Sequence, residues 1–343
     1  MKISVHKSSV FEVLQILRKK KAQEIDQAEV ERVFSHEDYL FEFGRYQGRL
    51  SREEMIRYFL NFEYLKSGQI ENEDLCQHHC FWLDFYFHVD EYEDRICEFL
   101  ENFNDEQIFA AYEQARKGFP EGYTIPECKV VFTCGIGRSF GYPYQNGIHF
   151  DVLRLMKEQE IMEDFQEIIA HELHHLIYNQ NIHIETEDIE GYFLQCFAGE
   201  GLAIKFTNNA QGLLSKKMYE DLSSNIGLDK ESIAYLNLEL EQSFSELKGT
   251  IQKIHMGEIK TRDEVDTLIC EYWLSLYHQE EPGGVEKLLA QPRLYTMGNE
   301  IWGTIFDVYG MDELYRIVNE PKECLEKFNH ALWTIGKPEY CIE

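Results

Sequence analysis

The five residues His171-Glu-Leu-His-His175 have the types and the spacing that water activation at a metal ion requires. On a helix, residues i and i+4 lie on the same face, so the imidazoles of His171 and His175 can bind one ion together. Glu172 projects about 100° away from His171 at 3.6 residues per turn, so it can reach a metal-bound water without binding the ion. Two nitrogen ligands, an open coordination position and a carboxylate base predict a site that hydrolyses its substrate.

The residues around this HExxH motif predict a long buried helix. Apolar residues recur at helical spacings and on more than one face: Ile161, Met162, Phe165, Ile168, Ile169, Leu173, Leu176 and Ile177. A helix that is apolar nearly all round is buried, and His and Glu side chains in it are costly without partners. A metal ion is one such partner for two imidazoles. The alternative is an amphipathic helix whose His residues hydrogen-bond to neighbouring groups.

Glu200 is the best candidate for a third ligand, because a catalytic zinc usually takes three protein ligands and leaves a fourth position to water. The residues around it are apolar: Leu194, Cys196, Phe197, Leu202, Ile204 and Phe206. A carboxylate among such residues requires a cation or a hydrogen-bond donor. Gly199 and Gly201 remove side-chain bulk where this helix would approach the metal helix. The alternative is a buried acid that pairs with an Arg or a His elsewhere in the chain.

Three motifs of the chain resemble those of the gluzincin-type zinc-dependent peptidases of bacteria. They are His171-Glu-Leu-His-His175, then Glu200-Gly-Leu-Ala203, and then Tyr295-Thr-Met-Gly298 before an apolar stretch. In gluzincins the third ligand is a Glu on a second helix some two dozen residues downstream, and in this chain 24 residues lie between the second His and Glu200. The resemblance covers roughly Val130 to Pro321.

This resemblance implies that Zn²⁺ is the cofactor, with His171, His175 and Glu200 as its ligands and Glu172 as the general base. The implied function is hydrolysis of peptide bonds in a peptide or protein substrate by a metal-activated water. Gluzincins commonly have an acid four residues after the third ligand, but Ile204 stands at that position here. Other groups must then orient the metal-binding His residues.

The fold that the resemblance implies is α+β and predominantly helical. It has a zincin-like core, in which a small β-sheet lies beside the HExxH helix, and a helical C-terminal lobe. Tyr295 in that lobe is the candidate hydrogen-bond donor to the oxyanion that forms during hydrolysis. Patterns along the chain predict three regions: a helical N-terminal region (1–120), the core with its strands, HExxH helix and Glu helix (121–208), and the C-terminal lobe (209–343).

Local patterns predict the elements that must position the site. Ser51-Arg-Glu-Glu54 is a capping box that begins a helix, and Leu75 to Leu100 reads as a continuous helix without Gly or Pro. Residues 129–133 and 147–151 read as two strands joined by a loop rich in Gly and Tyr. We hypothesise that this hairpin binds an extended peptide at its edge by strand addition. An ordinary hairpin is the alternative.

The composition excludes several classes of partner. The formal net charge of −29 argues against nucleic acid, whose phosphates must be neutralised by Lys and Arg. No stretch approaches the ~20 apolar residues of a membrane span, and the N-terminus has no apolar run typical of a signal peptide. The nine scattered cysteines are typical of reduced thiols rather than of a disulfide framework. We therefore expect a cytoplasmic protein that binds neither nucleic acid nor membrane.

Three alternatives remain from the sequence. Cys128 or Cys134 could complete the site as in peptide deformylases, although the glycine-flanked Cys motif of that family is missing. The segment Cys76-Gln-His-His-Cys80 could hold a structural zinc, but no second ligand pair follows at finger-like spacing, which favours incidental thiols. Finally, the chain could be a non-catalytic, metallopeptidase-like zinc-binding or regulatory protein. The intact Glu172 favours the enzyme, because a binding module gains nothing from a base.

Overall fold

The computed structural model describes residues 1–46, 48–136, 141–157, 165–183, 187–207, 212–216, 230–281 and 285–342. The chain forms two compact units, Met1–Ala110 with Ile125–Glu172, and Ala111–Thr124 with Leu173–Glu343. It is predominantly helical with a small mixed sheet, which confirms the predicted α+β class. The division into three regions, whose second boundary at 208/209 lies outside the described residues, stays a prediction.

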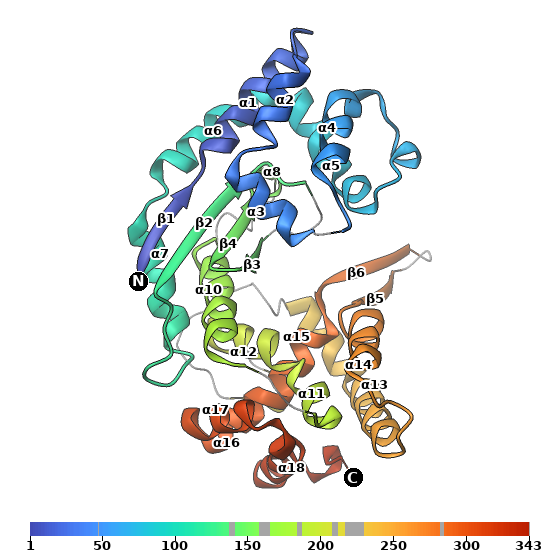
Figure 1. Cartoon of the computed structure of the whole chain (residues 1–343). Coiled ribbons are helices and arrows are strands. Elements are labelled where there is room, and N and C mark those ends of the chain that lie inside the picture. Colours follow the sequence, from blue (N-terminus) through green and yellow to red (C-terminus); the bar gives the residue numbers. More distant parts are fainter. Residues whose placement is uncertain are drawn as a thin grey trace. The chain divides into compact units, whose positions relative to one another are not determined.

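The first unit contains a four-stranded sheet with the strand order β1-β2-β4-β3 (Figure 1). The strands are β1 (Lys2–His6), β2 (Glu127–Thr133), β3 (Gly141–Tyr144) and β4 (Gly147–Asp151). β2 pairs in parallel with both β1 and β4, and β3 pairs antiparallel with β4. β4 is buried along its whole length, as expected for a strand inside a sheet whose faces are covered.

This topology corrects the predicted hairpin of residues 129–133 and 147–151. The two strands are neighbours, but they run parallel, and the hairpin partner of β4 is β3. The sequence of β3 is Gly-Tyr-Pro-Tyr, and its Gly and Pro indicate a turn rather than a strand. Proline is tolerated in a strand only where its missing N–H is not needed, as at the edge of a sheet. Lys2–His6 is also a strand in a region where only helices were expected.

Helices surround this sheet, with α1 and α3 in contact with β2 and α8 in contact with β4. The helices of the first unit, including one that continues into the second, are α1 (Ser8–Lys21), α2 (Gln27–Val33), α3 (Glu37–Arg45), α4 (Arg52–Asn61), the 3₁₀ turns Phe62–Tyr64 and Ser67–Gln69, α5 (Glu73–Phe87), α6 (Val89–Asn102), α7 (Asp105–Arg116) and α8 (Val152–Lys157).

Two helix predictions in this unit can be compared with the structure. The capping box of α4 is confirmed: Glu54 N–H donates to Ser51 Oγ at 3.2 Å, and Ser51 N–H donates to Glu54 Oε2 at 2.8 Å. The continuous helix from 75 to 100 is wrong, because α5 ends and α6 begins at His88. There the backbone N–H and ring Nδ1 of His88 lie 3.0 and 2.9 Å from the carbonyl oxygen of Asp84.

The second unit is helical apart from an antiparallel hairpin that the sequence did not predict, β5 (Leu276–Glu281) with β6 (Val285–Pro292). Among the described helices, none combines the length and the apolar character needed to cross a membrane. The helices are α10 (Phe165–Asn181), which begins in the first unit, α11 (Ile189–Gln195), α12 (Ala198–Thr207), α13 (Lys230–His255), α14 (Arg262–Leu268), the π-helix Ile269–Trp273, α15 (Arg293–Gly298), the π-helix Asn299–Gly303, α16 (Thr304–Tyr309), α17 (Met311–Asn319), the 3₁₀ turns Pro321–Glu323 and Pro338–Tyr340, and α18 (Cys324–Thr334).

Candidate metal centre

The HExxH motif lies on α10, and the described part of this helix is buried as the apolar pattern predicts. Its fully or nearly fully buried residues include Ile169, Ala170, Leu173, Leu176 and Ile177. Ile161 and Met162, which the sequence placed in the same helix, lie outside the described residues. The motif thus stands on a rigid, packed element, as a preorganised site requires.

His171, His175 and Glu200 come together, and each offers a ligand atom within 4.8 Å of those of the other two. His175 Nε2 lies 3.0 Å from Glu200 Oε2, and these two side chains are 12% and 25% exposed. Bonds of about 2.0–2.2 Å at tetrahedral angles would place two zinc ligand atoms ~3.4 Å apart. Two nitrogens and one oxygen at this spacing therefore fit a zinc ion. The partial exposure of the side chains would leave a fourth coordination position open to solvent.

His174, the remaining histidine of the motif, has a different environment. It is fully buried, and its ring centroid lies 4.4 Å from that of Phe119 and 6.2 Å from that of Phe206. Aromatic rings at these separations form favourable packing contacts. His174 therefore belongs to the aromatic core of the second unit and is not one of the clustered ligands.

Close packing of α12 against α15 positions Glu200. A Cβ atom on Gly201 would lie 2.2 Å from the carbonyl carbon of Gly298, so the two helix backbones touch at a pair of glycines. A Cβ on Gly199 would lie 4.0 Å from His175 Nδ1, which is an ordinary contact. Of the two glycines expected to face the metal helix, only Gly199 does so, whereas Gly201 faces α15.

Tyr295 lies on α15, the helix that packs against α12. It is half-buried, and the π-helix Asn299–Gly303 that follows α15 also contacts α12. Such π-helical turns are rare and frequently found at functional sites. The helix of Tyr295 and the helix of Glu200 are therefore neighbours in the second unit, while the role of Tyr295 as an oxyanion donor stays a prediction.

Glu172 is buried and lies next to the edge strand of the sheet. A Cβ atom on Gly141, the first residue of β3, would lie 3.4 Å from Glu172 Oε1. The tighter contacts of such a Cβ would be with the ring of Phe150, at 3.1 Å, so β3 passes within ordinary contact distance of the carboxylate. Ile204, at the position of the missing acid, is fully buried on α12.

A buried carboxylate holds the first residues of the loop after β2, of which 134–136 are described. Asp151 Oδ1 accepts the N–H groups of Gly135 at 2.7 Å and Leu153 at 2.9 Å, and Oδ2 lies 2.8 Å from His78 Nε2. Burial by itself raises the pKa of Asp151. The charge of His78 and its hydrogen bond, together with that of Gly135, outweigh burial and hold the pKa below its ordinary value. The loop is thus tied to a charge that has no contact with solvent.

A second buried acid holds the same loop from α3. Glu42 accepts the N–H of Ile136 at 2.9 Å and the hydroxyl of Thr133 at 2.7 Å. Thr133 Oγ1 also lies 2.7 Å from His149 Nε2 on β4. The sequence reasoning missed this network, because its members come from three segments that are far apart in the chain: α3, the end of β2 with the residues after it, and β4.

The cysteine-based alternatives find no support in the described part of the chain. The histidines of the segment Cys76–Cys80 have other partners: His78 Nε2 lies 2.8 Å from Asp151, and His79 Nδ1 lies 2.8 Å from the hydroxyl of Tyr58. Among the described residues, no cluster of three potential metal ligands includes a cysteine.

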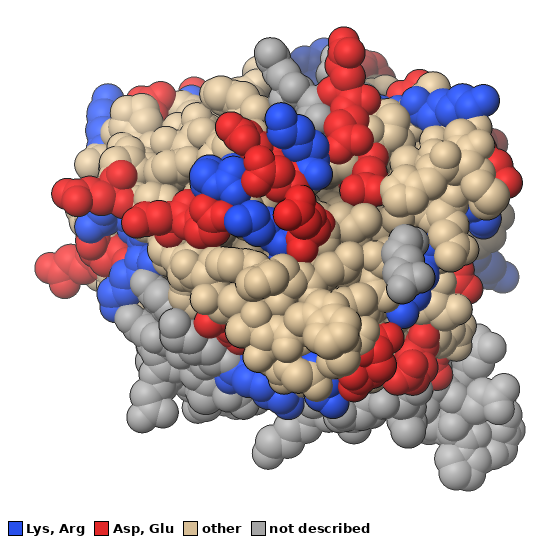
Figure 2. Space-filling view, turned by 90° about the horizontal axis from the view of Figure 1, so that it is seen from below, with Lys and Arg blue, Asp and Glu red and all other residues tan. Residues whose placement is uncertain are grey.

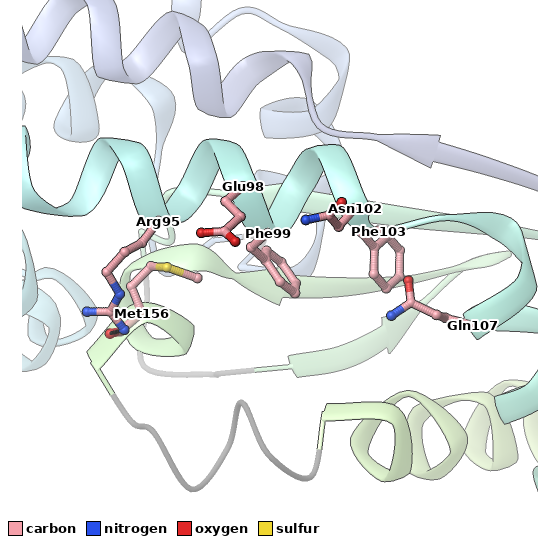
Figure 3. A pocket seen from close by; sticks show the side chains of 7 residues that line it. All are labelled: Arg95, Glu98, Phe99, Asn102, Phe103, Gln107 and Met156. Carbon is pink, nitrogen blue, oxygen red and sulfur yellow. Dashed lines mark hydrogen bonds between the residues drawn. The ribbon is translucent and has the colours of Figure 1, made fainter.

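The first unit also has a surface hollow of about 360 Å³, which contains none of the predicted site residues. The ring of Phe99 on α6 and the ring of Phe103, the residue that follows α6, point into it, with Met156 at one end (Figure 3). Its lining lacks a cluster of potential metal ligands, so we do not assign it a catalytic role. The lining residues are Arg95, Glu98, Phe99, Asn102, Phe103, Gln107 and Met156.

Comparison with known proteins gives one match. A family model described as "Putative zinc dependent peptidase (DUF5700)" matches residues 30–334, which include the HExxH motif, Glu200 and Tyr295. No curated protein and no solved structure was found to match the chain.

Proposed function

Because this chain belongs to the DUF5700 family, described as putative zinc dependent peptidases, we propose that it hydrolyses peptide bonds at the cluster of His171, His175 and Glu200. The observation that carries this proposal is the meeting of these side chains from α10 and α12. We also propose that the core is zincin-like and of the gluzincin type, since two ligands would come from HExxH and the third from a downstream Glu helix.

Zinc fits the residues present, which offer two imidazole nitrogens and one carboxylate oxygen. When bound, it would supply Lewis acidity, which makes a coordinated water more acidic and polarises the substrate carbonyl. His171 and His175 would hold it from adjacent turns of α10, and Glu200 from α12. The partial exposure of His175 and Glu200 leaves room for water and substrate.

Glu172 would act as the general base. It follows His171 on α10, so its carboxylate is near the ligands but displaced around the helix from them. In the reaction it would accept a proton from the attacking water and pass it to the leaving amine. General acid–base catalysis of this kind typically contributes about 10²–10⁴-fold to the rate.

The substrate would bind as an extended peptide along β3. This strand is at the edge of the sheet, and strand addition gives affinity through backbone hydrogen bonds. Because Gly141 lies beside Glu172, a peptide that follows β3 would bring one of its bonds close to the base. Tyr295 is the candidate donor to the oxyanion, and Tyr295→Phe is expected to lower kcat about 10²–10³-fold if it fills that role.

We propose no role for nucleic acid. The net charge of −29 would repel phosphates. On the face in Figure 2, Lys and Arg side chains lie among Asp and Glu side chains rather than in a separate basic patch.

The experiment that tests the function compares Glu172→Gln with the parent chain on a mixed peptide library. The parent should contain zinc and cleave peptides. Glu172→Gln should keep the zinc and lose turnover, and the exposed acid Glu187, replaced by Gln as a charge-matched control, should lose neither. Full activity in Glu172→Gln would overturn the mechanism. Stoichiometric zinc without cleavage in the parent would instead favour the alternative, a non-catalytic zinc-binding or regulatory protein.

A further inference from the structure

We propose that His6, Glu37 and Asp38 form a second metal site, independent of the proposed peptidase site, that binds a divalent transition-metal ion. His6 is the last residue of β1, and the two acids are in the first turn of α3. Each residue offers one ligand atom within 4.8 Å of those of the other two. An ion at this point would join the N-terminal strand to α3.

The distances suit a shared ion better than direct hydrogen bonds. His6 Nδ1 lies 3.2 Å from Glu37 Oε1 and 3.3 Å from Asp38 Oδ1. Two ligand atoms on one zinc at a tetrahedral angle would be ~3.4 Å apart, given bonds of about 2.0–2.2 Å. Asp38 Oδ1 accepts no hydrogen bond, although His6 Nδ1 lies close enough to donate one.

Asp38 is the observation that distinguishes this cluster from an ordinary acidic first turn. Its side chain is 0% exposed, and neither of its oxygens accepts a hydrogen bond from any residue that the structure describes. No described Lys or Arg lies within ion-pair distance of it. A carboxylate buried in this way is costly unless a cation compensates its charge.

His36 does not supply that compensation through a hydrogen bond. Its Nδ1 lies 3.2 Å from Asp38 Oδ2, but the same nitrogen accepts the backbone N–H of Asp38 at 3.2 Å as the N-cap of α3. A nitrogen that accepts this N–H directs its lone pair there and has no proton for the carboxylate. Its Nε2 faces Ser8 Oγ at 3.2 Å.

The donor set indicates the class of ion. One imidazole and two carboxylates suit Zn²⁺ or Mn²⁺, whereas Ca²⁺ prefers six to eight oxygens and soft ions prefer sulfur. Glu37 is 73% exposed, so water can complete the coordination from the solvent side. An ion here would join the end of β1 to the first turn of α3, so we assign the site a structural role.

The test measures zinc binding to the full chain with the peptidase site removed. In His175→Ala, isothermal titration with Zn²⁺ should still detect one bound ion, and zinc should raise the Tm. Adding Asp38→Asn should abolish both effects. The matched control is Asp105→Asn, which removes an exposed acid from the first turn of α7 in the same unit and should change neither.

A second variant is needed in case Asp38→Asn loses zinc because it misfolds rather than because it lacks a ligand. Glu37→Gln changes an exposed side chain, so it should fold normally and weaken zinc binding at least tenfold. Unchanged affinity in both variants would overturn the site, as would an equal loss in Asp105→Asn, which would indicate non-specific binding to surface acids. Because the readout is binding to a chain without His175, failure of the peptidase proposal would leave this result unaffected.

Discussion

Two His–carboxylate pairs of similar length lie in the two units of this molecule. His175 Nε2 is 3.0 Å from Glu200 Oε2 in the second unit, and His78 Nε2 is 2.8 Å from Asp151 Oδ2 in the first. The side chains of the first pair are 12% and 25% exposed, and those of the second are 1% and 0% exposed. The same two residue types at nearly the same distance therefore stand in different surroundings.

The neighbours of each pair explain what it can do. Asp151 Oδ1 also accepts two backbone N–H groups, and both side chains of this pair are closed off from solvent. Beside His175 and Glu200 lies a second imidazole, that of His171, which offers a ligand atom within 4.8 Å of theirs. The comparison indicates that a His–carboxylate pair is structural when it is buried and its carboxylate also accepts backbone N–H groups. Such a pair is suited to a metal when a third ligand lies beside it and solvent can reach it.

The largest expected effect is on activity, which should depend on the His175–Glu200 pair. His175→Ala should reduce bound zinc to background and abolish peptide cleavage, because two remaining ligands hold zinc poorly. The free energy of unfolding of the zinc-free chain should change little, since this side chain is partly exposed. Elemental analysis, a peptidase assay and urea unfolding measure the three quantities. Cleavage at the parent rate would remove His175 from the site.

The next effect is on stability and concerns the fully buried pair of His78 and Asp151, called the sealed pair below. Asp151→Asn should lower the free energy of unfolding by about 3–5 kcal/mol, because it removes the carboxylate from a fully buried His–carboxylate pair. The equivalent substitution in the other pair, Glu200→Gln, should abolish zinc binding and change the free energy of unfolding much less. Urea unfolding of both variants measures this. Equal stability losses would show that exposure does not distinguish the two pairs.

The elements of the metal centre could be predicted because their signals are local. His171, Glu172 and His175 lie within two helical turns, and helical periodicity fixes which of them share a face. Glu200 was indicated by the gluzincin spacing and by the cost of placing a carboxylate in an apolar helix without a partner. The DUF5700 match supports the zinc peptidase class, but no finding tests the individual ligands.

The sheet and the buried polar clusters could not be predicted, because their signals are non-local. The pairing of Lys2 with Glu127 joins residues far apart in the chain, and a strand as short as β3 with Gly and Pro resembles a turn. Asp38 shows the same limit, since a Glu-Asp pair at a helix start is ordinary in sequence. Only the fold brings His6 to it.

A smaller effect tests how backbone packing places Glu200. Gly201→Ala would put a Cβ 2.2 Å from the backbone of Gly298, which has no flexible side chain to move, and should cost about 1–3 kcal/mol of stability. The shift of α12 should also weaken zinc binding. Gly199→Ala is the matched control, because its Cβ would meet His175 Nδ1 only at 4.0 Å and alanine favours a helix. Similar behaviour of the two variants would contradict this account.

The smallest effect is the acid dependence of the sealed pair. The pKa of Asp151 lies below its ordinary value of 3.8 in the folded chain, so the unfolded chain takes up this proton first as the pH falls. The stability that the carboxylate contributes is therefore fully present above pH 3.8 and is lost as the pH falls through the lower folded value. The stability difference between the parent and Asp151→Asn, measured by urea unfolding from pH 6 to about pH 2, should shrink over that acid range alone. A difference that stays constant down to the lowest pH would mean that the hydrogen bonds of Asp151, rather than its charge, carry the stabilisation.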